Sequence, residues 1–195
     1  MADTNKIKYG IKNVVFFPAT IAANNSATYG DAIPVPGAVS LSMDAQGDST
    51  PFYADNIAYY TSVANNGYSG DLELAMIPEA VLTGIFGFVA DTNGILYEPV
   101  NAPVQHFAMA FQFEGDAHAK RHVLYNCTAT RPAVASATKA ESIEPQTETV
   151  SITATSIYVS SLDADIVKSE TVTSTDSTTY AGWFSAVYVP STLHT

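Results

Sequence analysis

The chain is short of charged residues, above all of basic ones. Only 14% of its 195 residues are charged, and Asp and Glu outnumber Lys and Arg by 19 to 8. The resulting formal charge of -11 repels phosphate polymers, which argues against tight binding of nucleic acid. Apolar residues make up 47% of the chain, so folding, alone or together with assembly, must bury a large apolar area. This balance indicates an oligomer.

Cysteine is also scarce, since Cys127 is the only one. No intrachain disulfide can form, which excludes the small disulfide-stabilised class of secreted proteins and favours folding in a reducing cytoplasm. Residues 1–12 are polar and lack the apolar stretch of a signal peptide. No later run is long enough to span a bilayer, so we expect no membrane insertion.

Motifs of enzymes are missing as well. The sequence contains no serine elbow, no phosphate-binding glycine loop, no zinc-protease helix and no cysteine pair. His118 and His122 lie four residues apart near Glu114, but the segment reads as a turn before a strand, where that spacing does not preorganise metal ligands. Two solvated turn histidines and a small core residue at Cys127 are the expectation. We therefore predict no catalytic, cofactor-binding or metal site, and no enzymatic activity.

What the chain has in abundance is the pattern of β-strands. Short stretches rich in Val, Thr, Tyr, Phe and Ile are separated by Gly, Asn, Asp and Pro, which is typical of all-β sandwiches and barrels. Apolar and polar residues alternate in residues 38–44, 71–76 and 107–114, which predicts half-buried strands there. Alternation returns at residues 147–155 and 180–189, after a loop at 128–146 that is rich in Ala, Thr and Ser.

One segment follows a helical period instead. After Pro78, the residues Val81, Leu82, Ile85 and Phe86 share one face, which predicts a single short helix packed on a sheet. Gly87 is expected to supply the left-handed residue that ends it. Asn-Gly within residues 91–94 predicts a tight turn between two apolar stretches.

Two further segments, residues 44–50 and 61–70, have no clean period and read as exposed connections that reach a neighbouring subunit. The predicted inter-subunit contacts in them are Asp44, Gln46, Gly47, Asp48, Asn66 and Tyr68. Strands rich in Thr and Ser bury little by themselves, so their edges need a neighbouring chain for pairing.

Several stretches, taken in order, resemble the major tail protein family of siphophages, in particular the type found in phages and prophages of Gram-positive bacteria. They are residues 9–14, 52–60, 66–75, 113–116, 121–127, 131–132 and 144–149. None of these stretches is a catalytic motif, so the resemblance implies an architecture and an assembly role rather than a reaction.

The resemblance implies a mainly β tail-tube fold, with two packed antiparallel sheets in a sandwich or barrel, one flanking α-helix and extended inter-subunit loops at about 44–70. Residues 1–195 form one domain in this view, with an N-terminal arm at about 1–12 and C-terminal strands at about 147–195. Family members form stacked rings of six subunits that build the tail tube of the virion after assembly in the host cytoplasm. The expected partners are further copies of the chain, the tape measure protein, the tail terminator and the distal tail protein.

Strand alternation places Asp71, Glu73 and Glu114 opposite the core, which makes them the predicted lumen-facing residues. Phage DNA passing through such a lumen would meet no fixed positive charge. Two alternatives stay open: the inner-tube protein of a contractile tail, bacteriocin or secretion system, and a carbohydrate- or receptor-binding β-sandwich whose tyrosines stack on sugars.

Overall fold

The computed structural model describes residues 6–103, 105–116, 118–138 and 145–191. Its strands in the first half of the chain are β1 (Lys6–Ile21), β2 (Ala27–Tyr29), β3 (Ile33–Pro34), β4 (Ala38–Ala45), β5 (Ser49–Ala54), β6 (Ile57–Val63), β7 (Tyr68–Leu74), β8 (Val89–Ala90) and β9 (Leu96–Tyr97). The second half adds β10 (His106–Asp116), β11 (Arg121–Ala129), β12 (Glu148–Thr155), β13 (Ile157–Val159), β14 (Ala164–Ile166) and β15 (Lys168–Glu170). Two short helices complete the fold, α1 (Glu79–Gly84) and α2 (Ser177–Gly182). The predicted mainly β class is confirmed.

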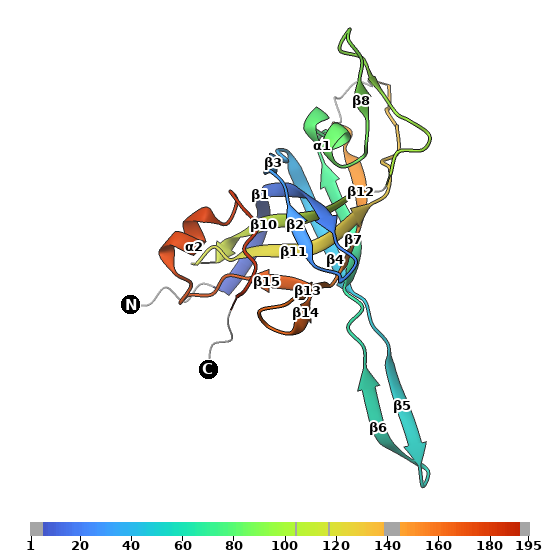
Figure 1. Ribbon diagram of the computed structural model, residues 1–195, viewed down its shortest axis with the longest axis vertical. Coiled ribbons are helices and arrows are strands. Elements are labelled where there is room, and N and C mark those ends of the chain that lie inside the picture. Colours follow the sequence, from blue (N-terminus) through green and yellow to red (C-terminus); the bar gives the residue numbers. More distant parts are fainter. Residues whose placement is uncertain (1–5, 104, 117, 139–144, 192–195) are drawn as a thin grey trace.

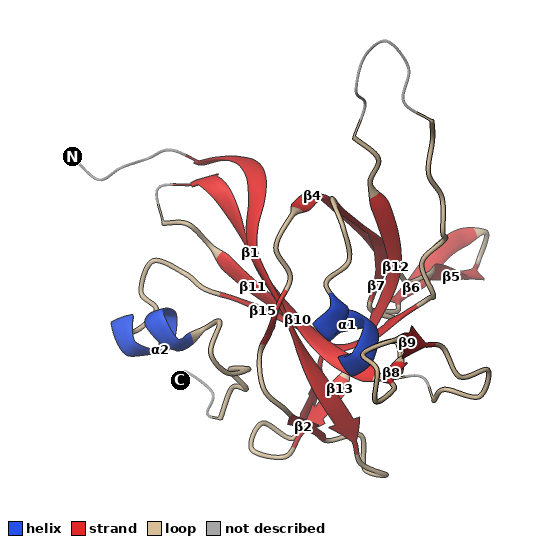
Figure 2. Ribbon diagram, turned by 90° about the horizontal axis from the view of Figure 1, so that it is seen from above, coloured by secondary structure: helices blue, strands red, loops and turns tan. Residues whose placement is uncertain are grey.

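Most strands belong to one antiparallel sheet of nine strands, whose main order is β2-β1-β10-β11-β12-β7-β4. Figure 2 shows that this sheet bends, so that its β1–β10–β11 half faces its β12–β7–β4 half. The apolar faces of the two halves meet in the main core, where Phe16, Phe107, Leu72 and Ile152 are fully buried. The expected packing of two sheets is thus made by one sheet folded on itself.

Strand alternation predicts this core well on the β12–β7–β4 half. Leu72 and Leu74 are buried, while Asp71 is exposed and Glu73 is partly exposed. Met76 was expected on the core face, but 71% of it is exposed. The reason is that β7 ends at Leu74 and the chain turns towards α1, so the period of two residues no longer applies.

The prediction of half-buried strands is wrong for β10. Ala108 and Ala110 face away from the main core and are nevertheless fully buried. They pack in a second cluster against Tyr125 and against Trp183, which comes from the C-terminal segment. Since this segment covers the outer face of β1, β10 and β11, these strands are buried on both faces.

The predicted helix is confirmed as α1, with Val81 fully buried on the core. Pro78 is its N-cap rather than its first helical residue. Gly87 has the expected positive φ, +73°, and the N–H of Phe88 donates to the carbonyl oxygen of Leu82 at 3.0 Å, which closes the helix end. The turn at residues 91–94 also forms, joining β8 to β9 with Gly94 at φ +79°.

Both ends of the described chain differ from the expectation. Residues 6–12 were assigned to an arm but begin β1, where Lys12 lies opposite Gln112 of β10. Residues 180–189 were expected to be strand, yet α2 occupies 177–182 and no strand follows within the described part. Asp176 starts this helix by accepting hydrogen bonds from the backbone N–H groups of Thr178 and Thr179.

Candidate assembly surfaces

A face made of hydroxyl and carboxylate groups covers the outside of β4, β7 and β12. The inward residues of β7 and β12 are apolar and buried, so every second residue points outward. The outward residues are Ser40, Ser42, Asp44, Ser69, Asp71, Glu73, Thr149, Ser151 and Thr153, all exposed or partly exposed. We call this set the hydroxyl–carboxylate face.

Strand register places each carboxylate of β7 between two hydroxyl residues. Glu73 lies opposite Ser40 and Thr149, and Asp71 lies opposite Ser42 and Ser151. The Ser151 hydroxyl donates to Asp71 Oδ1 at 2.7 Å. These bonds hold the carboxylates flat against the sheet, beside neutral donors rather than beside cations.

Glu73 is held in its ionised form by two hydroxyl groups. Thr147 Oγ1 donates to Glu73 Oε1 at 2.6 Å, and Ser40 Oγ donates to Oε2 at 2.8 Å. These hydrogen bonds, that of Thr147 first, lower the pKa of Glu73. The two hydroxyl groups therefore favour the charged form of Glu73.

The strands β4, β7 and β12 contain no Lys, Arg or His, so the hydroxyl–carboxylate face has no basic residue of its own. The deficit extends far beyond them: between Lys12 and Lys120 the chain has no Lys or Arg at all. The hydroxyl–carboxylate face consequently carries a negative potential that its own strands do not neutralise.

Of the three predicted lumen residues, the structure brings two together. Asp71 and Glu73 share the outward face of β7. Glu114 lies on β10, with β11 and β12 between it and β7 in the sheet, and it forms an ion pair with Lys12. Alternation alone finds outward residues but cannot tell which strands lie side by side.

The second surface is a hairpin formed by β5 and β6. These two strands pair only with each other and project away from the body (Figure 1). Six large side chains on it are 62–77% exposed: Phe52, Tyr53, Ile57, Tyr59, Tyr60 and Val63. A free two-stranded hairpin is marginally stable in water, so these side chains need a partner surface for burial.

The residues predicted as inter-subunit contacts lie in or next to the base of this hairpin. The Gln46 N–H donates to the Gly67 carbonyl and the Asn66 N–H donates to the Gln46 carbonyl, both at 2.8 Å. Ladder bonds thus continue from β4–β7 towards β5–β6, with Asp44 and Tyr68 inside the body strands and Asp48 beside Ala64. At Gly47 a Cβ would lie 1.9 Å from the Ala64 carbonyl oxygen, so only glycine fits. The exposed connections of the prediction are therefore paired backbone.

A sequence signal for the hairpin exists at its tip. Asp55 and Asn56 have φ of +51° and +62°, which is the type I′ turn that suits a two-residue hairpin loop. Asp-Asn between Phe52-Tyr53 and Tyr59-Tyr60 fits that turn, although the tip lacks the glycine that makes the signal strong.

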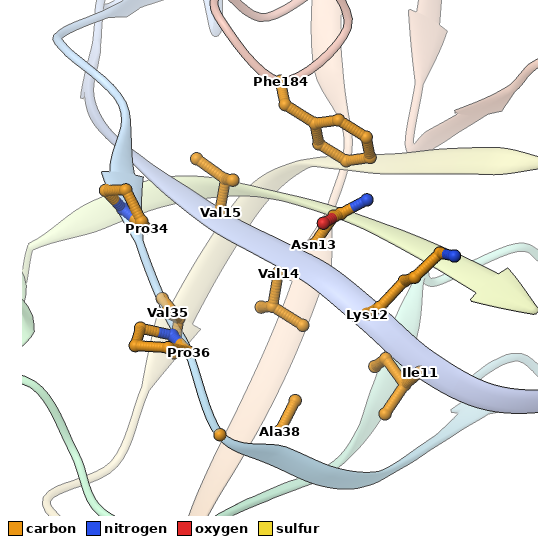
Figure 3. A pocket seen from close by; sticks show the side chains of 11 residues that line it. Ile11, Lys12, Asn13, Val14, Val15, Pro34, Val35, Pro36, Ala38 and Phe184 are labelled. Carbon is orange, nitrogen blue, oxygen red and sulfur yellow. The ribbon is translucent and has the colours of Figure 1, made fainter.

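A third feature is the open seam between β4 and β1. In the described residues β4 forms a ladder only with β7, which leaves its other edge unpaired. A groove of about 460 Å³ lies between β1 and residues 34–38, where the chain enters β4, and Figure 3 shows Val14 and Ala38 on its two sides. Val39 on this edge strand is 51% exposed. An unpaired edge of this kind is a site for pairing with another chain.

The residues considered for catalysis or metal binding lie in the core, in a turn or on a strand. Cys127 is fully buried in the main core, and burial raises the pKa of its thiol. His118 is in the turn after β10, but His122 is not the solvated residue expected: it lies on β11, stacked on Phe111 with ring centroids 5.1 Å apart. Burial lowers the pKa of His122 to about 4, against an opposing effect of Glu170.

Among the described residues, no group of three or more His, Cys, Asp or Glu is placed to hold a metal ion. Within the same part of the chain, no helix has the length and apolar character needed to cross a membrane.

No protein-family model and no curated protein matches the chain. Several chains of solved structures are loosely similar to it. One is the tube terminating cap of an anti-feeding prophage, with TM-score 0.45, 12% identity and coverage of 88% of this chain and 97% of that one. A second is a chain of the 6-fold symmetrised anti-feeding prophage baseplate, with TM-score 0.46, 10% identity and coverage of 88% of this chain and 99% of that one. A third is a chain of the sheath/tube terminator of an extracellular contractile injection system, with TM-score 0.43, 11% identity and coverage of 86% of this chain and 99% of that one. TM-scores below 0.5 leave the role of the chain to be argued from its own surfaces.

Proposed function

We propose that this chain is a structural subunit of a phage tail, which polymerises as stacked rings into the tube through which DNA is delivered. The observation that carries the proposal is the hydroxyl–carboxylate face on β4, β7 and β12. Its carboxylates are bonded to neighbouring hydroxyls and its strands contain no basic residue. The strands of such a wall offer phosphate groups no cation to bind, so DNA moves along them without being retained.

Ring closure accounts for the open seam and the open edge. The β4 edge has no ladder partner beyond β7 in the described chain. Pairing with the sheet of the next copy around a ring satisfies that edge and continues the hydroxyl–carboxylate face around a lumen. In this proposal Asp71 and Glu73 line the lumen. Glu114 is a weaker wall residue because Lys12 neutralises it.

The β5–β6 hairpin supplies the contact between rings. Its six exposed apolar or aromatic side chains have no partner surface within the body, from which the hairpin projects. Burial of such side chains stabilises an assembly by about 1.5–3 kcal/mol for each one fully buried. The proposal assigns the chain no enzymatic activity, and its partners are other copies and the proteins that start, measure and end the tube.

The assembly claim is tested by removing the hairpin. Residues 49–63 are replaced by Asn-Gly, which is feasible because the Ala64 N–H already donates to the Asp48 carbonyl at 3.1 Å. We expect a folded monomer that forms no tubes in negative-stain images of concentrated protein. A matched pair of point variants refines the test: Tyr53→Ser should impair tube formation, and Tyr97→Ser, on the β8–β9 hairpin, should not. Normal tubes from the excised variant would refute the role of the hairpin, and single rings from the unaltered chain would favour a tube-ending role.

The lumen claim is tested by the double variant Asp71→Lys/Glu73→Lys in particles. Tubes should form, and genome ejection at low salt should slow by about tenfold or more as new phosphate contacts retain the DNA. Asp31→Lys is the charge control, because Asp31 is exposed in the connection between β2 and β3, which pair with β1 in the other half of the bent sheet. Unchanged ejection in the double variant would remove that face from the lumen.

A further inference from the structure

Basic side chains gather in one part of the molecule. Lys8 and Lys12 lie on the first half of β1, Lys120 precedes β11, and Lys168 begins β15, which pairs with β11. The Lys120 and Lys168 ammonium groups each lie 3.5 Å from Glu170 carboxylate oxygens. Glu114 pairs with Lys12, and Glu170 is shared by Lys120 and Lys168, so these two carboxylates neutralise only part of the positive charge in this region.

A cavity of about 430 Å³ opens between Lys8 and Lys168, with Glu170 also in its lining. Its apolar walls come from both halves of the sheet and include Leu41, Met43, Phe111 and Phe113. A volume of this order, within the ~300–1,000 Å³ of ordinary ligand pockets, accepts aromatic side chains. We call it the lysine-rimmed cavity.

The lysines on its rim already lie beside aromatic rings. The Lys8 ammonium is 5.2 Å from the centroid of Phe113, and the Lys168 ammonium is 5.6 Å from that of Tyr68. Both lysines are exposed. The cavity thus suits an occupant that presents aromatic rings together with a carboxylate.

The β5–β6 hairpin has that composition. Its exposed side chains are mainly aromatic, with Phe52 and Tyr60 paired across the two strands. Asp55 is at its tip and Asp48 is near its base, and no Lys, Arg or His occurs in residues 46–66. The hairpin is acidic and aromatic. The cavity is mostly apolar, and its charged lining consists of Lys8, Lys168 and Glu170, the last of which also pairs with Lys120 outside the cavity.

The length of the hairpin and the position of the cavity allow the hairpin of one copy to reach the cavity of another. Met43 and Tyr68, which line the cavity, stand at the base of the hairpin. The ten residues from the base to the tip of the hairpin, 46–55, rise ~3.3 Å each, which makes the hairpin roughly 30 Å long. It points away from its own body (Figure 1). A second copy displaced by that length along the hairpin brings its cavity to the tip of the first.

We propose that the lysine-rimmed cavity receives the tip of the β5–β6 hairpin from a second copy of this chain. The inference rests on the proposed tube function and names the receptor of its stacking contact. Asp55 then lies beside Lys168 and Lys8, and aromatic side chains of the tip enter the apolar cavity. Because donor and receptor are different surfaces, the contact is head-to-tail. Displacement of each copy along the hairpin axis makes it repeat as an open stack rather than a closed ring, as elongation of a tube requires.

Disulfide trapping between two single variants tests this contact. Asp55→Cys and Lys168→Cys proteins are mixed, assembled and oxidised. The native Cys127 is fully buried and does not compete. We expect covalent dimers from the mixture and none from either variant alone. Asp91→Cys with Lys168→Cys is the matched control and should give none.

Charge reversal gives an independent readout. Lys8→Glu/Lys168→Glu should raise the protein concentration needed for assembly by tenfold or more, and Asp55→Lys added to that variant should recover most of the loss. Thermal unfolding of each monomer checks that the fold is intact. Tubes that form without the Asp55–Lys168 disulfide, or equal trapping in the control, would refute the cavity as receptor and leave the tube function standing. Absence of any tubes from the unaltered chain would refute both.

Discussion

The β5–β6 hairpin and the β1–β10–β11 half of the sheet are made of similar residues in opposite surroundings. Phe107 on β10 is fully buried, and Phe52 on β5 is 62% exposed. β10 is covered on one face by the main core and on the other by the C-terminal segment, while β5 pairs only with β6. The difference separates two uses of aromatic strands: one stabilises the monomer, and the other is available to the assembly.

The largest effect that tests this comparison comes from two matched truncations. Phe107 lies 4.6 Å from Phe16, measured between ring centroids, so Phe107→Ala leaves a cavity in the core. We expect a loss of about 3–5 kcal/mol in the free energy of unfolding. Phe52→Ala should change it by less than about 0.5 kcal/mol. Urea denaturation of the monomer measures both, and comparable losses would mean that the hairpin belongs to the cooperative core.

A smaller effect should appear as the pH falls. His122 has a pKa of about 4 in the fold, below its ordinary 6.5, because burial disfavours its charged form. As the pH falls, His122 therefore takes up a proton in the unfolded chain before it does so in the folded one. Its contribution to the free energy of unfolding is fully present above pH 6.5 and is lost as the pH falls from 6.5 to about 4. We expect a loss on the order of 1–2 kcal/mol after allowing for solvent screening.

The variant His122→Phe keeps a ring stacked on Phe111 and should remove this pH dependence. Unfolding free energies measured across that pH range give the comparison. If the unaltered protein and the variant lose stability in parallel as the pH falls, His122 is not the group responsible.

The Asp176 side chain at the start of α2 should contribute to the free energy of unfolding about as much as a typical helix N-cap. Asp176 accepts from the Thr178 and Thr179 N–H groups at 2.9 and 3.0 Å, and α2 leads into Trp183, which covers β10. Asp176→Ala should cost about 1 kcal/mol of stability. Asp55→Ala, the same change at the hairpin tip, should leave the unfolding midpoint of the monomer unchanged. Equal losses would contradict the separation of body and hairpin.

Local patterns in the sequence predicted the elements that depend on local rules. The strands β4, β10 and β12, the helix α1 and the turn before β9 follow from alternation, helical period and Asn-Gly. Outward placement of Asp71 and Glu73 follows from the same alternation. These properties need only neighbouring residues, so one sequence suffices for them.

What depends on distant contacts was not predictable in the same way. Ala108 and Ala110 are buried because a segment some 70 residues later folds over them, and no local sequence pattern predicts that contact. The continuation of the β4–β7 ladder into the β5–β6 hairpin was not predicted, because Gly47 and Asn66 interrupt alternation while backbone pairing continues. Separation of Glu114 from Asp71 and Glu73 follows from strand order, which alternation does not contain. Most differences therefore concern tertiary arrangement, whereas residues 6–12 and 180–189 differ in the type of element as well.

The smallest expected effect lies at the hairpin turn. Asn56 has φ +62°, a conformation that glycine adopts without strain, and Asp-Gly is a preferred type I′ pair. Asn56→Gly should stabilise the hairpin by a few tenths of a kcal/mol, seen as slower amide hydrogen exchange in residues 49–63. Global unfolding should not change, because the body unfolds independently of these residues. A raised unfolding midpoint would show that hairpin and body unfold together, and the exposed aromatic strands would then belong to the monomer's own stability rather than to the assembly.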